Sequence, residues 1–161
     1  MTSIASIAAV AWRVWLWLAK TLRRPPRWVR VTAVASASIL VLNVLWHGAQ
    51  PYAVGLLPNG WDKVAHIALH FVLCTLLLFA LGLRRGWWAV AVCAAFSALD
   101  EYAQQFSPGR SVEFADWVAS VAGALLGLAV AHALEWQVEM RRLHRAVHMK
   151  RTMARWLRPP P

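Results

Sequence analysis

The chain has 161 residues, of which 60% are hydrophobic and 15% are charged. A soluble globular domain is about 45–50% apolar and about 25% charged, so this composition excludes an ordinary water-soluble globule and indicates one membrane domain. Lys and Arg number 17 against 7 Asp and Glu, which gives a formal net charge of +10. A bilayer admits positive charges only at certain positions, so their placement predicts the topology.

Residues 1–27 are predicted to form an amphipathic helix in the cytoplasmic interface of the membrane. Ile7, Val10 and Val14 share one helical face, whereas polar and basic side chains share another. No basic residue precedes the apolar run, and Arg13 interrupts it. The segment therefore matches neither a signal peptide nor a membrane span.

Four stretches are apolar enough, at about 20 residues each, to cross a bilayer core about 30 Å thick. They are Trp28–His47, Val64–Leu83, Gly86–Phe106 and Asp116–Glu135. Short connections with Gly, Pro or Arg-Arg separate them, which favours antiparallel neighbours in a compact bundle. We therefore expect an all-α, polytopic four-helix membrane domain over residues 28–136, followed by a basic tail over residues 137–161.

Basic residues cluster around the N-terminal segment, at the Arg84-Arg85 turn and in the C-terminal tail. By the positive-inside rule, both termini and this turn are cytoplasmic, and the loops 47–63 and 107–115 lie outside. The basic tail is expected to lie on anionic membrane lipid, with a solvated tail as the alternative. Nucleic acid is not an expected partner, because no nucleic-acid-binding fold accompanies the charge.

One stripe of the second span carries Asp62, His66, His70 and Cys74 at intervals of four residues. Two histidines one turn apart can chelate zinc, but nothing in the sequence guarantees a third and a fourth ligand. We therefore expect no metal and no other cofactor, and we expect His70 to be hydrogen-bonded within the bundle. Cys74 and Cys93 lie in apolar runs and are expected to be free thiols.

Acidic residues concentrate toward the outer ends of the spans and the second outer loop. They are Asp62, Asp100, Glu101, Glu113 and Asp116. Ionisable groups at such depth are energetically unfavourable and commonly mark functional or pairing sites. The helical rise of about 1.5 Å per residue places Glu101 and His66 at similar depths, so they are expected to be able to meet.

Other residues of this region have specific expected roles. Asp100 and Gln104 lie one turn apart on the third span. Asp116 opens the fourth span, where an aspartate is a natural helix cap. Arg110 is expected either to pair with the carboxylates or to grip an anionic group of a ligand.

These residues together resemble the VanZ-like family of bacterial membrane proteins, which is named for a teicoplanin resistance protein. The resemblance covers roughly Asp62 to Gly127 and leaves both basic ends outside. It maps the family's D-K-x-x-H, acid-x-x-Gln, Gly-Arg and helix-opening Asp motifs onto Asp62, Lys63, His66, Glu101, Gln104, Gly109, Arg110 and Asp116. Ala103 stands where many relatives carry His, and Ser120 where they carry Asn or Asp. The resemblance implies a multi-pass protein of the bacterial inner membrane with a role in cell-envelope processes or in glycopeptide tolerance.

Three functions remain open from the sequence. The first is a non-enzymatic protein whose outer cluster binds a lipid-linked or anionic envelope component or another membrane protein. The second is an enzyme acting on a lipid-linked head group, with Glu101 or His66 as the acid–base residue. The third is proton-coupled transport by an oligomer. The ligand-binding candidates are Lys63, His66, Asp100, Glu101, Gln104, Arg110 and Asp116.

A homo-oligomer is a further candidate assembly. Ala119, Gly123 and Gly127 form a row of small residues spaced by four along the fourth span. Such a row forms either a dimer seam or a close contact between helices of one bundle.

Overall fold

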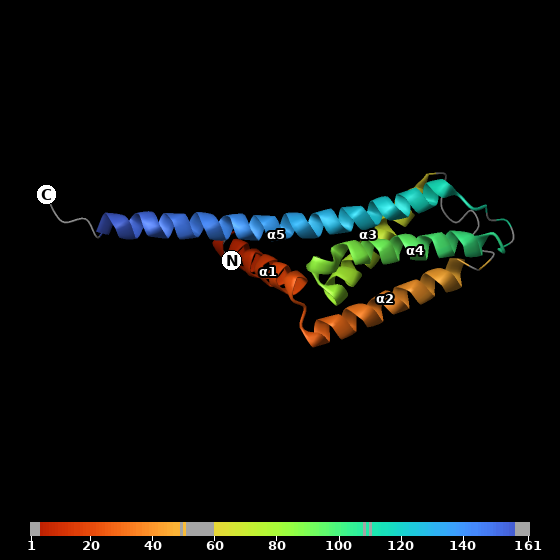
Figure 1. Ribbon diagram of the computed structural model, residues 1–161, viewed down its shortest axis with the longest axis horizontal. Coiled ribbons are helices and arrows are strands. Elements are labelled where there is room, and N and C mark those ends of the chain that lie inside the picture. The colour runs from red at the N-terminus through yellow and green to blue at the C-terminus, as the bar shows by residue number, and fades with distance from the viewer. Residues whose placement is uncertain (1–3, 49, 51–59, 108, 110, 157–161) are drawn as a thin grey trace.

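The computed structural model describes residues 4–48, 50, 60–107, 109 and 111–156, and every regular element in this part of the chain is helical. The elements are α1 (Ile4–Arg23), α2 (Arg27–Gly48), α3 (Trp61–Leu81), the short 3-10 helix η2 (Leu83–Arg85), α4 (Gly86–Gln104) and α5 (Phe114–Trp156). Figure 1 labels the five α-helices. The expected all-α class is therefore confirmed.

Helices α2 to α5 run alternately up and down (Figure 1). We call the end where α2 and α4 finish and α3 and α5 begin the outer end, after the side of the membrane expected for it. The opposite end, with η2 and the turn between α1 and α2, is called the inner end. The last turns of α5 project beyond the inner end.

Three helices are long and apolar enough to cross a membrane: α2, α3 and the Phe114–Met149 part of α5. The chain is therefore a membrane protein with three helices of spanning character. Helix α4 has 19 residues and is not among them, since its last turns carry Asp100, Glu101 and Gln104 and lower its hydropathy.

Helix α3 is the centre of the bundle and packs against α2, α4 and most extensively α5. Helices α3 and α5 run in the same direction, and their closest approach lies at Gly123. A Cβ atom at Gly123 would lie 2.2 Å from the carbonyl oxygen of Ile67, and one at Gly127 would lie 3.2 Å from that of Phe71. The row of small residues is therefore covered by α3 of the same chain.

The ends of the helices follow local sequence signals. Helix α3 stops where Gly82 takes a positive φ of 84° and its N–H donates to the Leu78 carbonyl oxygen, a conformation that suits glycine. Helix α5 continues for 43 residues, well past the expected end of the span at Glu135. No Gly or Pro occurs between Gly127 and Pro159, so nothing in the sequence interrupts this helix.

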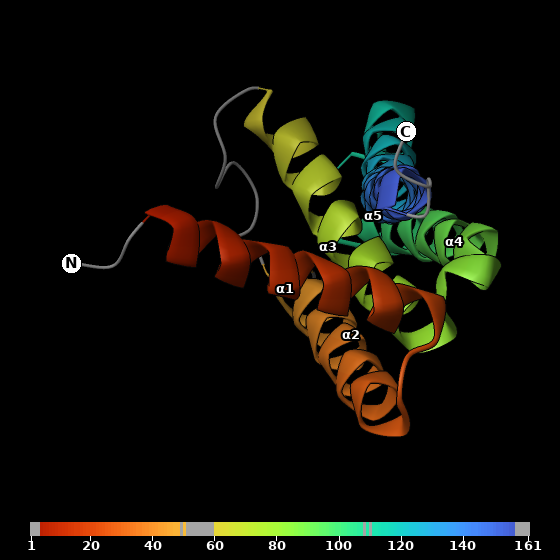
Figure 2. The ribbon, with the colours of Figure 1, turned by 90° about the vertical axis from the view of Figure 1, so that its left-hand side faces the viewer.

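Helix α1 crosses the axis of α5 instead of running alongside it, as Figure 2 shows with α5 seen nearly end-on. Its contacts with α5 include the Trp12 ring, which lies 4.8 Å from the Arg141 guanidinium and 5.2 Å from that of Arg145. Its exposed apolar side chains include Ile7, Val10 and Val14. Helix α1 therefore exposes an apolar face, and its place in the membrane interface stays a prediction.

The buried core between the two ends contains apolar and small side chains, among them Leu78, Ala89 and Ala124. Cys74 and Cys93 belong to this core and are both free thiols, as expected. Outward-facing side chains on α2, by contrast, are large and apolar, for example Val34 and Leu42. An apolar exterior around a tightly packed interior is typical of helices surrounded by lipid.

Candidate functional site

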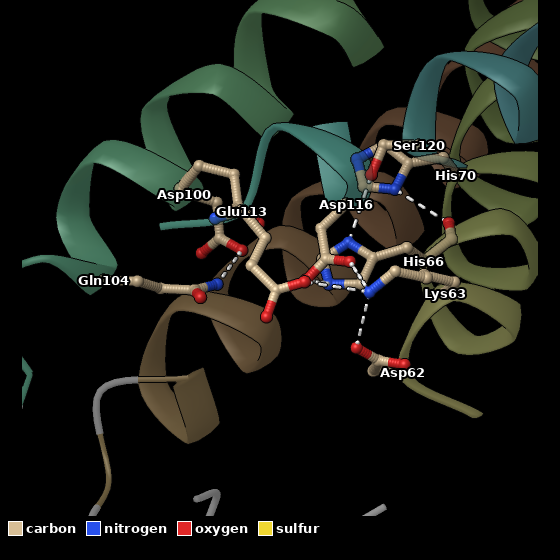
Figure 3. A network of polar contacts seen from close by, with 10 residues as sticks. Asp62, Lys63, His66, His70, Asp100, Gln104, Glu113, Asp116 and Ser120 are labelled. Atoms are coloured by element: carbon tan, nitrogen blue, oxygen red, sulfur yellow. Dashed lines mark hydrogen bonds and ion pairs between the residues drawn. The ribbon is translucent and has the colours of Figure 1, made fainter. Parts of the chain in front are cut away.

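Lys63 is the hub of the polar cluster at the outer end. Its Nζ lies 3.0 Å from Asp62 Oδ2, 3.0 Å from Glu113 Oε2 and 3.0 Å from Asp116 Oδ1 (Figure 3). The lysine and Asp62 belong to the first turn of α3, whereas the other two carboxylates come from the start of α5 and the residue just before it. Three carboxylates therefore already neutralise the ammonium that was a candidate for gripping an anion.

Asp116 links this hub to His66. Its second carboxylate oxygen, Oδ2, lies 3.7 Å from His66 Nε2, while the other ring nitrogen, Nδ1, lies 3.1 Å from the hydroxyl of Ser120. Asp116 is 8% exposed and Ser120 is fully buried. The side chain expected to cap α5 thus bridges α5 and α3 through both of its oxygens.

Glu101 reaches the same place from α4. Only 4% of it is exposed, and its Oε2 accepts the backbone N–H of Glu113 at 3.2 Å. Its Oε1 is buried and has no hydrogen-bond partner. One ligand atom from each of Glu101, His66 and Asp116 lies within 4.8 Å of the others. The expected meeting of Glu101 and His66 is therefore confirmed, and Asp116 joins them.

Three ligand-binding candidates remain: Asp100, Gln104 and Arg110. Gln104 Nε2 donates to Asp100 Oδ2 at 3.1 Å, and both residues are buried on α4. In Figure 3 this pair lies to one side of the Lys63 hub. Arg110 lies outside the described residues.

His70 lies one turn deeper than His66 and is 1% exposed. Its Nδ1–H donates to the backbone carbonyl oxygen of His66 at 3.0 Å. Its ring lies 6.0 Å from that of Phe96 and is stacked at 6.3 Å on that of His66. The expected hydrogen bond of His70 within the bundle is confirmed. His70 contacts His66 twice, through the backbone carbonyl oxygen and through the ring.

Three members of the cluster were not among the ligand-binding candidates: Glu113, Ser120 and Asp62, which pairs with Lys63. Glu113 binds Lys63 through its side chain and Glu101 through its backbone N–H. Ser120 lies one turn after Asp116 and hydrogen-bonds His66. This helical spacing was the available signal for Ser120, because residues four apart share a face.

The inner end has the opposite charge. A cavity of about 630 Å³ lies between α1, η2 and α5. Its lining includes the basic residues Lys20, Arg23, Arg24, Arg84 and Arg142, and the acids Glu135 and Glu139. Arg23 pairs with Glu135 and lies 3.7 Å from Glu139 Oε2. The contact with Glu135 raises the pKa of Arg23 above its usual range.

A family model matches most of this sequence. The sequence model described as VanZ/LLP1 matches residues 7–135. The match begins within α1, so it extends well beyond the Asp62 to Gly127 region that carries the motifs, and the N-terminal end is not outside the family region. Neither the curated proteins nor the solved structures gave a match. Because the match covers most of the chain, including all three helices that form the acidic cluster, the protein belongs to the VanZ/LLP1 family.

Proposed function

We propose that this protein crosses the bacterial inner membrane four times, with both termini in the cytoplasm, and that its outer polar cluster binds the head group of a lipid-linked envelope component. The charge asymmetry supports this orientation. Basic residues surround the inner end, and the positive-inside rule places such residues on the cytoplasmic side.

Helix α4 is proposed as the fourth span. Its 19 residues extend about 28 Å, close to the thickness of about 30 Å of a bilayer core. Exposed aromatic side chains lie near both of its ends, with Trp87 and Trp88 at the inner end and Tyr102 and Phe106 at the outer end. Aromatic residues in these positions are typical of the two membrane interfaces.

Cysteine labelling tests this topology. In a background with Cys74 and Cys93 replaced by alanine, a cysteine at Ser111 should react with an impermeant thiol reagent applied to the periplasmic side of the membrane. A cysteine at Arg85 should react only after the membrane is permeabilised. Equal labelling of both positions from one side would place the two ends of α4 on the same side and exclude the fourth span.

The observation that carries the binding function is the burial of Glu101 with one carboxylate oxygen that has no hydrogen-bond partner. Its carboxylate is buried, one oxygen is unpartnered, and the nearby acids Asp100 and Asp116 repel its charge. Buried polar groups are normally satisfied, and an unsatisfied group that persists points to a role other than stability. Lys63 is engaged by three carboxylates, so we assign His66 and Glu101, among the described residues, as the groups that meet a ligand.

An enzyme acting on a lipid-linked head group is the second candidate. A carboxylate oxygen of Glu101 and a ring nitrogen of His66 lie within 4.8 Å of each other, so the two groups can exchange a proton with one bound molecule. Ser120, although hydrogen-bonded to His66, is fully buried and is not accessible as a nucleophile. Acid–base chemistry is therefore the form of catalysis this site supports.

The Glu101→Gln variant tests the binding function. It should melt at the same or a higher temperature than the wild type, because a buried charge is removed with little change of shape. The corresponding gain in the free energy of unfolding should be at most about 2 kcal/mol. It should nevertheless lose the lipid-linked species that native mass spectrometry detects with the wild-type protein extracted in detergent. Glu139→Gln, the same change on the inner part of α5, is the control and should retain that species.

A cellular readout accompanies this measurement. In a strain lacking the protein, the wild type and Glu139→Gln should restore teicoplanin tolerance, whereas Glu101→Gln should not, at equal abundance in the membrane. Full tolerance with Glu101→Gln would contradict the assignment of the outer cluster. A head group that is chemically altered only by the wild type would favour the enzyme over the binding protein.

The inner cavity is proposed to bind the phosphate of an anionic membrane lipid. Five basic side chains and two carboxylates line it, and in the described part of the chain Lys20, Arg84 and Arg142 have no carboxylate within ion-pair distance. Basic pockets between helices on the cytoplasmic side commonly bind anionic lipid head groups. The combined variant Arg84→Gln and Arg142→Gln should retain less phosphatidylglycerol in native mass spectrometry, whereas Arg13→Gln, outside the cavity lining, should behave as wild type.

A further inference from the structure

Three helices each contribute one potential metal ligand to a single point near the outer end. His66 comes from α3, Glu101 from α4 and Asp116 from α5, and their ligand atoms all lie within 4.8 Å of one another. Two ligands of one tetrahedral zinc ion lie about 3.4 Å apart, given bonds of about 2.0–2.2 Å. The 3.7 Å between His66 Nε2 and Asp116 Oδ2 is close to this separation.

The hydrogen bonding of His66 orients it as a ligand. Its Nδ1 lies 3.1 Å from the hydroxyl oxygen of Ser120. Donation of the Nδ1 proton to that oxygen leaves Nε2 with a free lone pair that faces the Asp116 carboxylate. A ligating histidine usually donates its other ring N–H in this way, which fixes the tautomer and the direction of the ring.

One carboxylate oxygen at this point has no partner. Glu101 is 4% exposed, and its Oε1 is buried without a hydrogen-bond partner. Glu101 and Asp116 bring two carboxylates together, while Lys63, which pairs with Asp116, is shared by three carboxylates. Burial of unneutralised charge is strongly unfavourable, so a cation between Glu101, Asp116 and His66 would stabilise all three groups.

The neighbouring group of acids differs in this respect. Asp62, Glu113 and Asp116 also lie within 4.8 Å of one another, but the ammonium of Lys63 already lies 3.0 Å from a carboxylate oxygen of each. That position is filled by the protein's own cation. The two groups therefore provide an internal comparison, in which the second already holds a cation of the protein.

We propose that His66, Glu101 and Asp116 bind a divalent metal ion of the Zn²⁺ type, with Ser120 as a positioning residue. Imidazole and carboxylate ligands suit such an ion, and three protein ligands leave a coordination position open. This revises the expectation of no metal: the sequence provided one histidine pair on one helix, whereas the fold adds carboxylates from two other helices. The inference deepens the proposed function, on which its biological role rests, since the open position would receive an oxygen of the head group.

The test measures metal binding by the full-length protein, purified in detergent with an affinity tag free of histidine and stripped with a chelator. Titration with Co²⁺ should produce visible d–d absorption, and added Zn²⁺ should abolish it. Glu101→Gln and Asp116→Asn should weaken Co²⁺ binding at least tenfold, and Ser120→Ala by about tenfold, because partners that orient a ligand contribute about 10–100-fold in affinity.

The acid-to-amide variant Glu139→Gln is the matched control. Glu139 lies on the inner part of α5, outside the outer cluster, and pairs with Arg23, so this change should not alter the absorption. Thermal melting of each metal-free variant shows whether it is folded, and Ser120→Ala decides the question if Glu101→Gln does not fold.

Three results would overturn the metal site. They are the absence of Co²⁺ absorption in the wild type, its persistence in folded Glu101→Gln, or its loss in folded Glu139→Gln. If Glu101→Gln lost the bound lipid-linked species while the wild type bound no metal, the proposed function would stand and the metal inference would fall. If the wild type bound metal but no lipid-linked species, the metal inference would stand and the proposed function would fall.

Discussion

The two ends of the helix bundle carry opposite charge and use it in different ways. At the outer end, three acids surround Lys63 and two more lie on α4, and Asp100, Glu101 and Asp116 among these five are buried. At the inner end, five basic side chains line a cavity with two acids. Among the described residues, three of the outer acids share one lysine, whereas several basic residues line the inner cavity.

Burial determines how strongly each end depends on single contacts. Exposed ion pairs contribute little because water and salt screen them, whereas removal of one partner from a buried pair leaves an uncompensated charge. Substitutions at the outer end should therefore have larger effects on stability than equivalent substitutions at the inner end. The predictions below test this comparison, beginning with the contact that brings the outer acids together.

The largest effect is expected for Gly123→Ala. The added Cβ would lie 2.2 Å from the Ile67 carbonyl oxygen, so the backbones of α3 and α5 must separate. Overpacking of this kind lowers stability by about 1–3 kcal/mol, and here it would also displace Asp116 from Lys63. Thermal melting in detergent measures the loss.

Two other glycines serve as graded controls for that substitution. Gly127→Ala should cause a smaller loss, because its Cβ would lie 3.2 Å from the Phe71 carbonyl oxygen, and Gly48→Ala should be close to neutral, with its nearest neighbour, Asp100 Oδ1, at 3.8 Å. Equal melting temperatures for all three variants would contradict the close approach of α3 and α5.

A smaller but clear effect is expected for Lys63→Met. Loss of the ammonium leaves Asp62, Glu113 and Asp116 to repel one another, which should lower the melting temperature by about 2–4 °C at low salt. Higher salt should reduce the difference, because it screens the remaining repulsion. Lys20→Met, which removes one of several basic residues from the inner cavity, should change the melting temperature little. A larger loss with Lys20→Met would reverse the contrast between the two ends.

The smallest effect is expected for Arg23→Gln. Arg23 pairs with Glu135 and Glu139, but its side chain is 53% exposed. Such a pair contributes little to stability in water, so the melting temperature should fall by no more than about 2 °C. Its visible consequence should be faster proteolysis of α1, since this contact joins α1 to α5. Unchanged proteolysis would show that Trp12 and the rest of the interface hold α1 without the pair.

The sequence by itself determined the helical class, the membrane character and most helix limits. The predicted stretch Trp28–His47 became α2, Arg27–Gly48, and Gly86–Phe106 became α4, Gly86–Gln104. Length of an apolar run and the position of Gly or Pro are local properties, which is why they could be predicted. The extension of α5 past Glu135 was missed because a change from apolar to basic residues marks a membrane boundary, not the end of a helix.

The proximity of Glu101 and His66 could also be predicted from the sequence, because the depth of a residue along a helix follows from the rise per residue. Only the tertiary structure decided how each helix is rotated and which helices are neighbours. The absence of a side chain at Gly123 lets α3 and α5 approach side by side, and this contact sets Asp116 between Lys63 and His66. Such a juxtaposition depends on the packing of surfaces more than 50 residues apart in the chain, which a local pattern cannot specify.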